Sequence, residues 1–131
     1  MKQANRIGYI AGPYRGATRR EVVANIKRAE DLARALWKKG HPVICPHLNT
    51  SLFDGIAPDG LFLQVDLEIL SRCDYVIIID DCKLSESAWK EIGLARELRL
   101  PVYWICCPGS SRQRILEILK DETPWEVLDA E

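Results

Sequence analysis

Short continuous apolar runs alternate along the chain with stretches in which apolar residues recur at helical spacing. The runs cover residues 7–11, 42–45, 75–79 and 100–106, and each has the length of a strand. The run at residues 75–79 is apolar throughout, which is typical of a central strand that is covered on both faces. Gly12-Pro13 ends the first run and begins a loop.

Helices are predicted after each of these strands. The first begins with a capping box formed by Thr18 and Glu21, carries an apolar stripe from Val22 to Leu36 and ends near Gly40. Asp59 is expected to cap the second helix. The third is expected to be capped by Ser85 or Ser87 and to run to about residue 99, and a fourth is expected after Ser110, Ser111, Arg112 and Gln113.

Strands that alternate with helices predict a parallel sheet, because right-handed crossovers join such strands. The expected fold is therefore α/β: a single-domain Rossmann-like (flavodoxin-like) parallel sheet of four to five strands flanked by helices, spanning residues 1–131. The optional fifth strand is a short edge strand at residues 123–128. Ligands of such sheets bind at the carboxyl ends of the strands. This singles out the loops at residues 12–17, 46–58, 80–87 and 107–111.

The charge balance and the apolar runs limit the choice of partners. Lys and Arg total 18 and Asp and Glu total 19, so the formal net charge of −1 gives no reason to expect nucleic acid as a partner. No apolar run is long enough to span a membrane, and residues 1–6 lack the apolar stretch of a signal peptide. We therefore expect a cytoplasmic protein with no membrane partner.

The cysteine and histidine pattern argues against a metal site. The chain has five cysteines, an odd number, and none are at C-x-x-C spacing. Neither of the two histidines has a cluster of cysteines or carboxylates around it at metal-ligand spacing. We expect neither a metal nor a cofactor.

The loop after the first strand has the composition of an anion site. It contains Gly12, Arg15 and Gly16 and leads into a helix N-terminus, where backbone N–H groups and the helix dipole favour a negative charge. It is neither G-x-G-x-x-G nor a P-loop, so no motif supports a dinucleotide or nucleoside triphosphate. On these residues alone, a plain turn with a solvated arginine is an equally good interpretation.

The third helix brings hydroxyl groups and a carboxylate to the same end of the sheet. Ser85 and Ser87 lie at its N-terminus, where hydroxyls suit a phosphate or a sugar, and Glu91 lies one turn after Ser87 on the same face. A carboxylate in that place suits attack on an anomeric carbon. Periodicity alone favours the simpler interpretation, in which a cap is followed by a surface glutamate.

Four further residues have both a functional and a structural interpretation. Asp66 is either a general acid near a leaving group or a half-exposed helix carboxylate, and Tyr9 either orients a carboxylate or packs in the core. His47 either contacts a ligand or is solvated, and Ser110 either caps a helix or helps to hold an anion. Within and just after the long loop at residues 46–58, Asn49, Asp54 and Asp59 are candidates for contact with a base.

Taken in order, several segments resemble the nucleoside 2-deoxyribosyltransferase superfamily. The segments are YIAGPYRG at residues 9–16, PH at 46–47, VDL at 65–67, DYV at 74–76, EIGLA at 91–95 and LPV at 100–102. Within the superfamily, the chain is more similar to the 2′-deoxynucleoside 5′-phosphate N-hydrolases and their small bacterial relatives. Pro13 stands where that branch often has a phosphate-binding serine, and Ser87 replaces a frequent glycine.

The resemblance implies roles for individual residues. It makes Glu91 the nucleophile, Tyr9 the residue that orients it and Asp66 the partner of the leaving base. It places a substrate phosphate on Gly12, Arg15, Gly16 and Ser85, where transferases of free nucleosides tend to have aspartate at the last position. His47, Ser87 and Ser110 are the remaining expected substrate contacts. Members of the superfamily are usually dimers or larger, with neighbouring subunits completing each site, so we expect a homodimer or a higher homo-oligomer.

The expected activity is that of an N-glycosidase. We expect hydrolysis of the N-glycosidic bond of a nucleoside or deoxynucleoside 5′-monophosphate, which releases the free base and a sugar 5-phosphate. The alternatives are base exchange by a transferase on unphosphorylated nucleosides, or a non-catalytic module that binds a nucleotide. Each takes a small-molecule nucleotide or nucleoside as partner.

Overall fold

Four parallel strands and four helices make up the described part of the chain. The structure is a computed structural model, and it describes residues 5–80, 86–106, 119–120 and 122–125. In chain order the elements are β1 (Gly8–Ala11), α1 (Arg19–Lys38), β2 (Val43–Ile44), α2 (Pro46–Asn49), α3 (Asp59–Ser71), β3 (Tyr75–Asp80), α4 (Glu86–Glu97) and β4 (Val102–Cys106).

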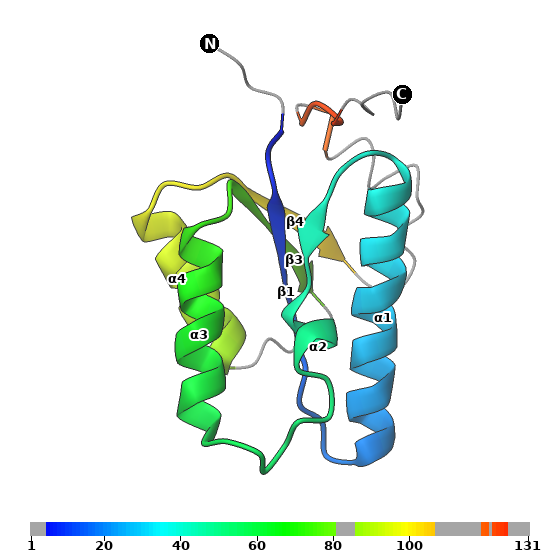
Figure 1. Cartoon of the computed structure of the whole chain (residues 1–131), viewed down its shortest axis with the longest axis vertical. Coiled ribbons are helices and arrows are strands. Elements are labelled where there is room, and N and C mark those ends of the chain that lie inside the picture. The colour runs from blue at the N-terminus through cyan, green and yellow to red at the C-terminus, as the bar shows by residue number, and fades with distance from the viewer. Residues whose placement is uncertain (1–4, 81–85, 107–118, 121, 126–131) are drawn as a thin grey trace, which may run out of the picture.

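The sheet has the strand order β2-β1-β3-β4, and every neighbouring pair is parallel. Helix α1 covers one face, while α3 and α4 cover the other (Figure 1). The expected fold class is confirmed, with four strands. The extent of the domain, residues 1–131, stays a prediction.

Alternate residues of the central strands enter two separate apolar clusters. Ile10 and Ile77 pack with α1 residues such as Leu36, whereas Tyr9 and Ile78 pack on the α3–α4 side. Both faces of β1 and β3 are therefore buried, which explains why their sequences are apolar without alternation.

Helix α1 begins as its sequence predicts. The Thr18 side chain accepts a hydrogen bond from the Glu21 backbone, and the Glu21 carboxylate accepts one from the Thr18 backbone. This reciprocal pair fixes the start of the helix directly after the loop that follows β1.

The start of one helix differs from the prediction, and that of another excludes one of two candidate caps. Asp59 does not cap α3: Pro58 occupies the cap position without a side-chain hydrogen bond, and Asp59 is the first helical residue. The chain thus enters α3 one residue earlier than expected. Of the two serines expected at the start of α4, Ser87 is not the cap, because the helix already includes Glu86. Ser85 lies outside the described residues, so its role as the cap stays a prediction.

The long loop and the tail also depart from the prediction. Residues 46–58 are not a continuous loop, since Pro46 at the first helical position starts the short helix α2. Residues 123–125 are not a strand; instead the Trp125 backbone N–H donates to the Gly40 carbonyl at 2.8 Å, and its indole N–H donates to the Arg6 carbonyl at 2.9 Å. The expected helix after Ser110 and residues 126–128 lie outside the described part of the chain.

None of the helices in the described residues is long and apolar enough to cross a membrane.

Candidate active site

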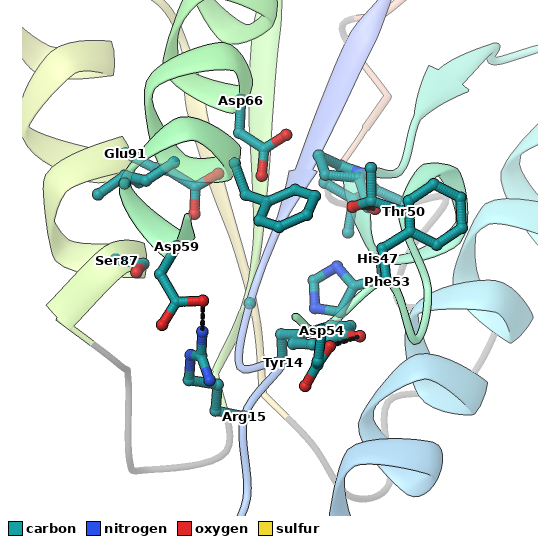
Figure 2. A pocket seen from close by; sticks show the side chains of 16 residues that line it. Tyr14, Arg15, His47, Thr50, Phe53, Asp54, Asp59, Asp66, Ser87 and Glu91 are labelled. Atoms are coloured by element: carbon teal, nitrogen blue, oxygen red, sulfur yellow. Dashed lines mark hydrogen bonds and ion pairs between the residues drawn. The ribbon is translucent and has the colours of Figure 1, made fainter. Parts of the chain in front are cut away.

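A cavity of about 260 Å³ opens at the carboxyl ends of β1 and β2 (Figure 2). It lies between α3 and α4 on one side and the α2 segment on the other. Its lining residues are Ile10, Gly12, Tyr14, Arg15, Pro46, His47, Thr50, Phe53, Asp54, Asp59, Gly60, Phe62, Leu63, Asp66, Ser87 and Glu91. The expected location of a ligand site is therefore hollowed and lined by polar groups.

A hydrogen bond at the base of the cavity joins two residues that are 82 positions apart. The Tyr9 hydroxyl, from β1, donates to Oε2 of Glu91 in α4. Tyr9 is fully buried and Glu91 is 7% exposed. A buried carboxylate without a hydrogen-bond partner lowers the stability of the fold. The hydrogen bond from the Tyr9 hydroxyl therefore offsets part of the free-energy cost of burying Glu91.

Burial changes the acidity of both carboxyl groups in this part of the cavity. It raises the pKa of Glu91 to about 8, with a further increase from the nearby charge of Asp66, while the hydrogen bond from Tyr9 acts in the opposite direction. Burial also raises the pKa of Asp66 to about 6. Shifted carboxyl groups that face a cavity are typical of functional sites.

Asp66 extends into the cavity from α3, beside Glu91 of α4 (Figure 2). The two helices pack together on the same face of the sheet, and this packing brings the carboxyl groups into the electrostatic contact that raises the pKa of Glu91. The structure thus brings together the three residues expected to be catalytic: Tyr9, Asp66 and Glu91.

The loop after β1 contributes Gly12 and Arg15 to the lining, but not Gly16. A Cβ on Gly12 would approach the Ile79 side chain at 3.0 Å, and one on Gly16 would lie 2.4 Å from Cβ of Glu21. Gly16 is therefore required by the close approach of the loop to the first turn of α1. Arg15 forms an ion pair with Asp59 at 2.8 Å across the cavity mouth.

His47 is buried in the wall rather than solvated. Its Nε2 lies 2.9 Å from the Pro13 carbonyl, which can only accept, so Nε2 carries the hydrogen. Burial lowers the pKa of the ring and favours the neutral form. Nδ1 is then an acceptor, and it has no hydrogen-bond partner among the described residues.

Several lining residues were not expected from the sequence. The Tyr14 hydroxyl donates a hydrogen bond to Asp54 at 3.3 Å and accepts one from the Leu52 N–H at 2.8 Å. These two bonds connect the loop after β1 to the segment at residues 46–58. Phe53, Phe62 and Thr50 also line the cavity. The aromatic pair Phe53 and Phe62 was detectable as apolar residues close to the expected site, whereas nothing in the sequence marked Tyr14 as a tie between two loops.

The other expected contacts divide into three groups. Ser87, Asp54 and Asp59 line the cavity. Asn49 instead lines a separate shallow groove beside α1 and β2. Ser85 and Ser110 lie outside the described residues. Within the described part of the chain, no three His, Cys, Asp or Glu side chains are arranged to hold a metal ion.

Comparison with solved structures defines the class of fold. A 2-deoxyribosyltransferase of the psychrotolerant bacterium Bacillus psychrosaccharolyticus aligns with a TM-score of 0.60 at 21% identity, covering 79% of this chain and 74% of that one. The 2-deoxyribosyltransferase of Leishmania mexicana aligns with a TM-score of 0.58 at 16% identity, covering 79% and 66%. The CMP N-glycosidase BcmB of Clostridium botulinum gives 0.51 at 19% identity, covering 88% and 98%. The chain thus has the fold of these proteins.

The sequence itself places the chain in a family. Residues 6–105 match the model of the domain of unknown function DUF7768, and the protein belongs to that family. No protein among those with curated descriptions matches the sequence.

Proposed function

We propose that this protein hydrolyses the N-glycosidic bond of a nucleoside or deoxynucleoside 5′-monophosphate, with Glu91 as the nucleophile. The observation that carries the proposal is the buried pair of Tyr9 and Glu91 at the base of the cavity, with Asp66 beside it. The activities for which the structural neighbours are named, deoxyribosyl transfer and N-glycosidic cleavage, support the same class of chemistry.

In the first step, a carboxylate oxygen of Glu91 attacks the anomeric carbon of the sugar. The bond from that carbon to the base nitrogen breaks, its electron pair leaves with the base, and a glycosyl ester forms on Glu91. Tyr9 holds the attacking carboxylate in one orientation through its hydrogen bond. In the second step, water attacks the anomeric carbon, releases Glu91 and gives the sugar 5-phosphate.

Asp66 is assigned to the departing base. Its side chain enters the cavity from α3, whereas Ser87 and Arg15 lie toward the mouth. With its pKa raised to about 6, Asp66 is able to deliver a proton to the base or to hold it as an acceptor around neutral pH. Phe53 and Phe62 offer apolar surface for the base in the same cavity.

The sugar and its 5′-phosphate are assigned to three residues of the cavity lining, Gly12, Arg15 and Ser87. We extend this assignment to Gly16, Ser85 and Ser110. Arg15 supplies a charge-assisted contact at the cavity mouth. Gly16 supports this part of the site indirectly, because it allows the loop to approach α1. His47 keeps the loop in place through the Pro13 carbonyl and presents Nδ1 as an acceptor.

The test is the release of free base from a panel of ribo- and deoxynucleoside 5′-monophosphates and matched nucleosides. We expect release from at least one monophosphate and a loss of at least about a thousandfold in Glu91→Gln, since the amide cannot form the ester. Glu86→Gln is the matched control, because Glu86 lies on the same helix, is exposed and pairs only loosely with Lys90 at 3.9 Å. Full activity in Glu91→Gln would refute the assignment.

A transferase acting on unphosphorylated nucleosides is the second candidate. The lining favours it in one respect: the described cavity residues include four carboxyl groups, those of Asp54, Asp59, Asp66 and Glu91, against a single arginine. This reaction predicts that an added free base replaces the original base and that the 5′-phosphate makes no difference. Stabilisation by nucleotides without base release or exchange would instead indicate a binding module.

We further propose that the protein forms a homodimer or a higher homo-oligomer through the outer surface of α3 and α4. Leu61 and Val65, four residues apart on α3, are 47% and 45% exposed, and Trp89 on α4 is 54% exposed. Light scattering after size exclusion should give a multiple of the chain mass, and Leu61→Glu with Val65→Glu should reduce it. Val23→Glu, at a similarly exposed position on α1, is the control; a monomeric wild type would exclude the assembly.

A further inference from the structure

The ion pair between Arg15 and Asp59 crosses the mouth of the candidate active site. Arg15 belongs to the loop after β1, and Asp59 is the first residue of α3, 44 positions later. Nη2 of Arg15 lies 2.8 Å from Oδ1 of Asp59, and both side chains line the cavity (Figure 2). The guanidinium at the mouth is therefore already paired with an anion in the free protein.

Arg15 is the only arginine or lysine among the described residues that line this cavity. Within the described lining, an anionic group on a ligand at the mouth therefore has one guanidinium to meet, and that guanidinium is paired with the Asp59 carboxylate. A phosphate that takes Arg15 has to displace Asp59 and also leaves an unpaired carboxylate close to its own negative charge. A ligand without a phosphate leaves the pair as it is.

We propose that Asp59 determines how strongly the site discriminates between 5′-phosphorylated and unphosphorylated ligands, by competing with the phosphate for Arg15. This inference rests on the proposed function, because it takes Arg15 as the residue that meets the phosphate. Asp59 is then a specificity-determining residue that acts against the phosphorylated ligand, and it takes no part in breaking the glycosidic bond.

The sign of the effect follows from the exposure of the pair. The Arg15 and Asp59 side chains are 62% and 73% exposed, so the attraction between them is weak and a ligand breaks it at small cost. Only a ligand that takes Arg15 has to break the pair, so this cost falls on the phosphorylated ligand alone. Loss of the charge on Asp59 should therefore help the phosphate more than it harms the placement of Arg15.

The experiment compares the binding of deoxynucleosides and their 5′-monophosphates by calorimetry in the non-hydrolysing Glu91→Gln protein, with and without Asp59→Asn. We expect Asp59→Asn to raise the ratio of monophosphate affinity to nucleoside affinity by about three- to tenfold, through the monophosphate alone. Glu68→Gln is the matched control: Glu68 lies on the same helix, forms a similarly exposed ion pair with Arg72 at 3.1 Å away from the cavity lining, and its substitution should leave the ratio unchanged.

A second variant tests whether the effect passes through Arg15. In an Arg15→Gln background, the added Asp59→Asn substitution should change the affinity ratio by much less than it does alone, because there is no guanidinium left to release. An unchanged or lower ratio in Asp59→Asn, an equal gain for nucleosides, or the same gain without Arg15 would each overturn the inference.

The outcomes separate this inference from the proposed reaction. Base release from monophosphates together with an unchanged affinity ratio overturns only the role of Asp59. A raised ratio without any base release supports the role of Asp59 and overturns the hydrolase. If neither class of ligand binds the intact chain, both proposals fall.

Discussion

The central residue of the site, Glu91, is a buried carboxyl group whose environment works against its ionised form. Burial is the largest cause of its raised pKa, and Asp66 adds to it, whereas the hydrogen bond from the Tyr9 hydroxyl lowers the pKa. A nucleophilic carboxylate has to be ionised, so the fraction of the protein in which Glu91 can attack should increase with pH up to about 8. The placement of Tyr9 therefore bears on both the orientation and the charge of Glu91.

The raised pKa of Glu91 predicts a specific dependence of stability on pH. Between pH 4.5 and about 8 the folded chain keeps the proton on Glu91 that the unfolded chain releases, so the contribution of this group to folding falls as pH increases. Glu91→Gln does not titrate. Its free energy of unfolding should therefore rise relative to wild type by at least about 1 kcal/mol between pH 5 and pH 8. Urea unfolding at several pH values measures this.

A difference in the free energy of unfolding between wild type and Glu91→Gln that stays constant with pH would contradict this prediction. It would mean that Glu91 ionises as easily in the folded chain as in the unfolded one. The control is Glu86→Gln, the same substitution at an exposed position of the same helix.

At the scale of elements, the ends of the helices decide where the site residues lie. The capping box of α1 fixes the exit of the loop that carries Arg15, whereas α3 begins after Pro58 without a side-chain cap and places Asp59 at the cavity mouth. The two helix starts near the cavity mouth thus differ in capping: α1 has side-chain cap hydrogen bonds, and α3 has none.

Thr18→Ala should lower the free energy of unfolding by about 1 kcal/mol, because it removes the acceptor of the Glu21 backbone N–H. Thr18→Ser should restore most of this loss, since serine is an equally good cap. Denaturant unfolding of the three proteins measures both effects. Equal losses in the two variants would show that the methyl group, and not the cap, is responsible.

At the scale of the whole molecule, the two ends of the sheet serve different purposes. The cavity lies at the carboxyl ends of the strands, whereas Glu122 contacts Arg6, which precedes β1 at the other end of the sheet. Glu122 is 4% exposed, accepts a hydrogen bond from Tyr103 at 2.7 Å and lies 3.2 Å from the Arg6 guanidinium. The contacts of Glu122 with Tyr103 and Arg6 stabilise the fold, and none of these three residues lines the cavity.

Glu122→Ala should therefore cost about 1–3 kcal/mol of stability, because it removes a buried partner of both Tyr103 and Arg6. At temperatures where the variant is folded, its affinity for nucleotides should match that of the wild type. Thermal unfolding and calorimetry measure the two properties, with the exposed Glu97→Ala as control. A large loss of affinity in the folded variant would show that the two ends of the sheet are coupled.

The fold followed from local patterns, and this is why most of it was predictable. Continuous apolar runs mark buried parallel strands, and the spacing from Val22 to Leu36 marks one face of a helix. The error at Asp59 arose because several polar residues stand close to the start of α3, and the entry of the chain into a helix depends on tertiary packing. Of the two serines expected at the start of α4, the structure excludes Ser87. The helix inside residues 46–58 is one turn long, too short for periodicity to reveal.

The sequence by itself determined the parallel α/β fold, the end of the sheet where the cavity lies and several of the residues that line it, because these depend on apolar runs and on chain order. Only the tertiary structure decided that Tyr9 meets Glu91, that Asp66 stands beside them and that Arg15 is already paired with Asp59. These contacts join residues 44 to 82 positions apart, or side chains of separate helices. Their geometry follows from how α3 and α4 pack on the sheet, which no local pattern contains.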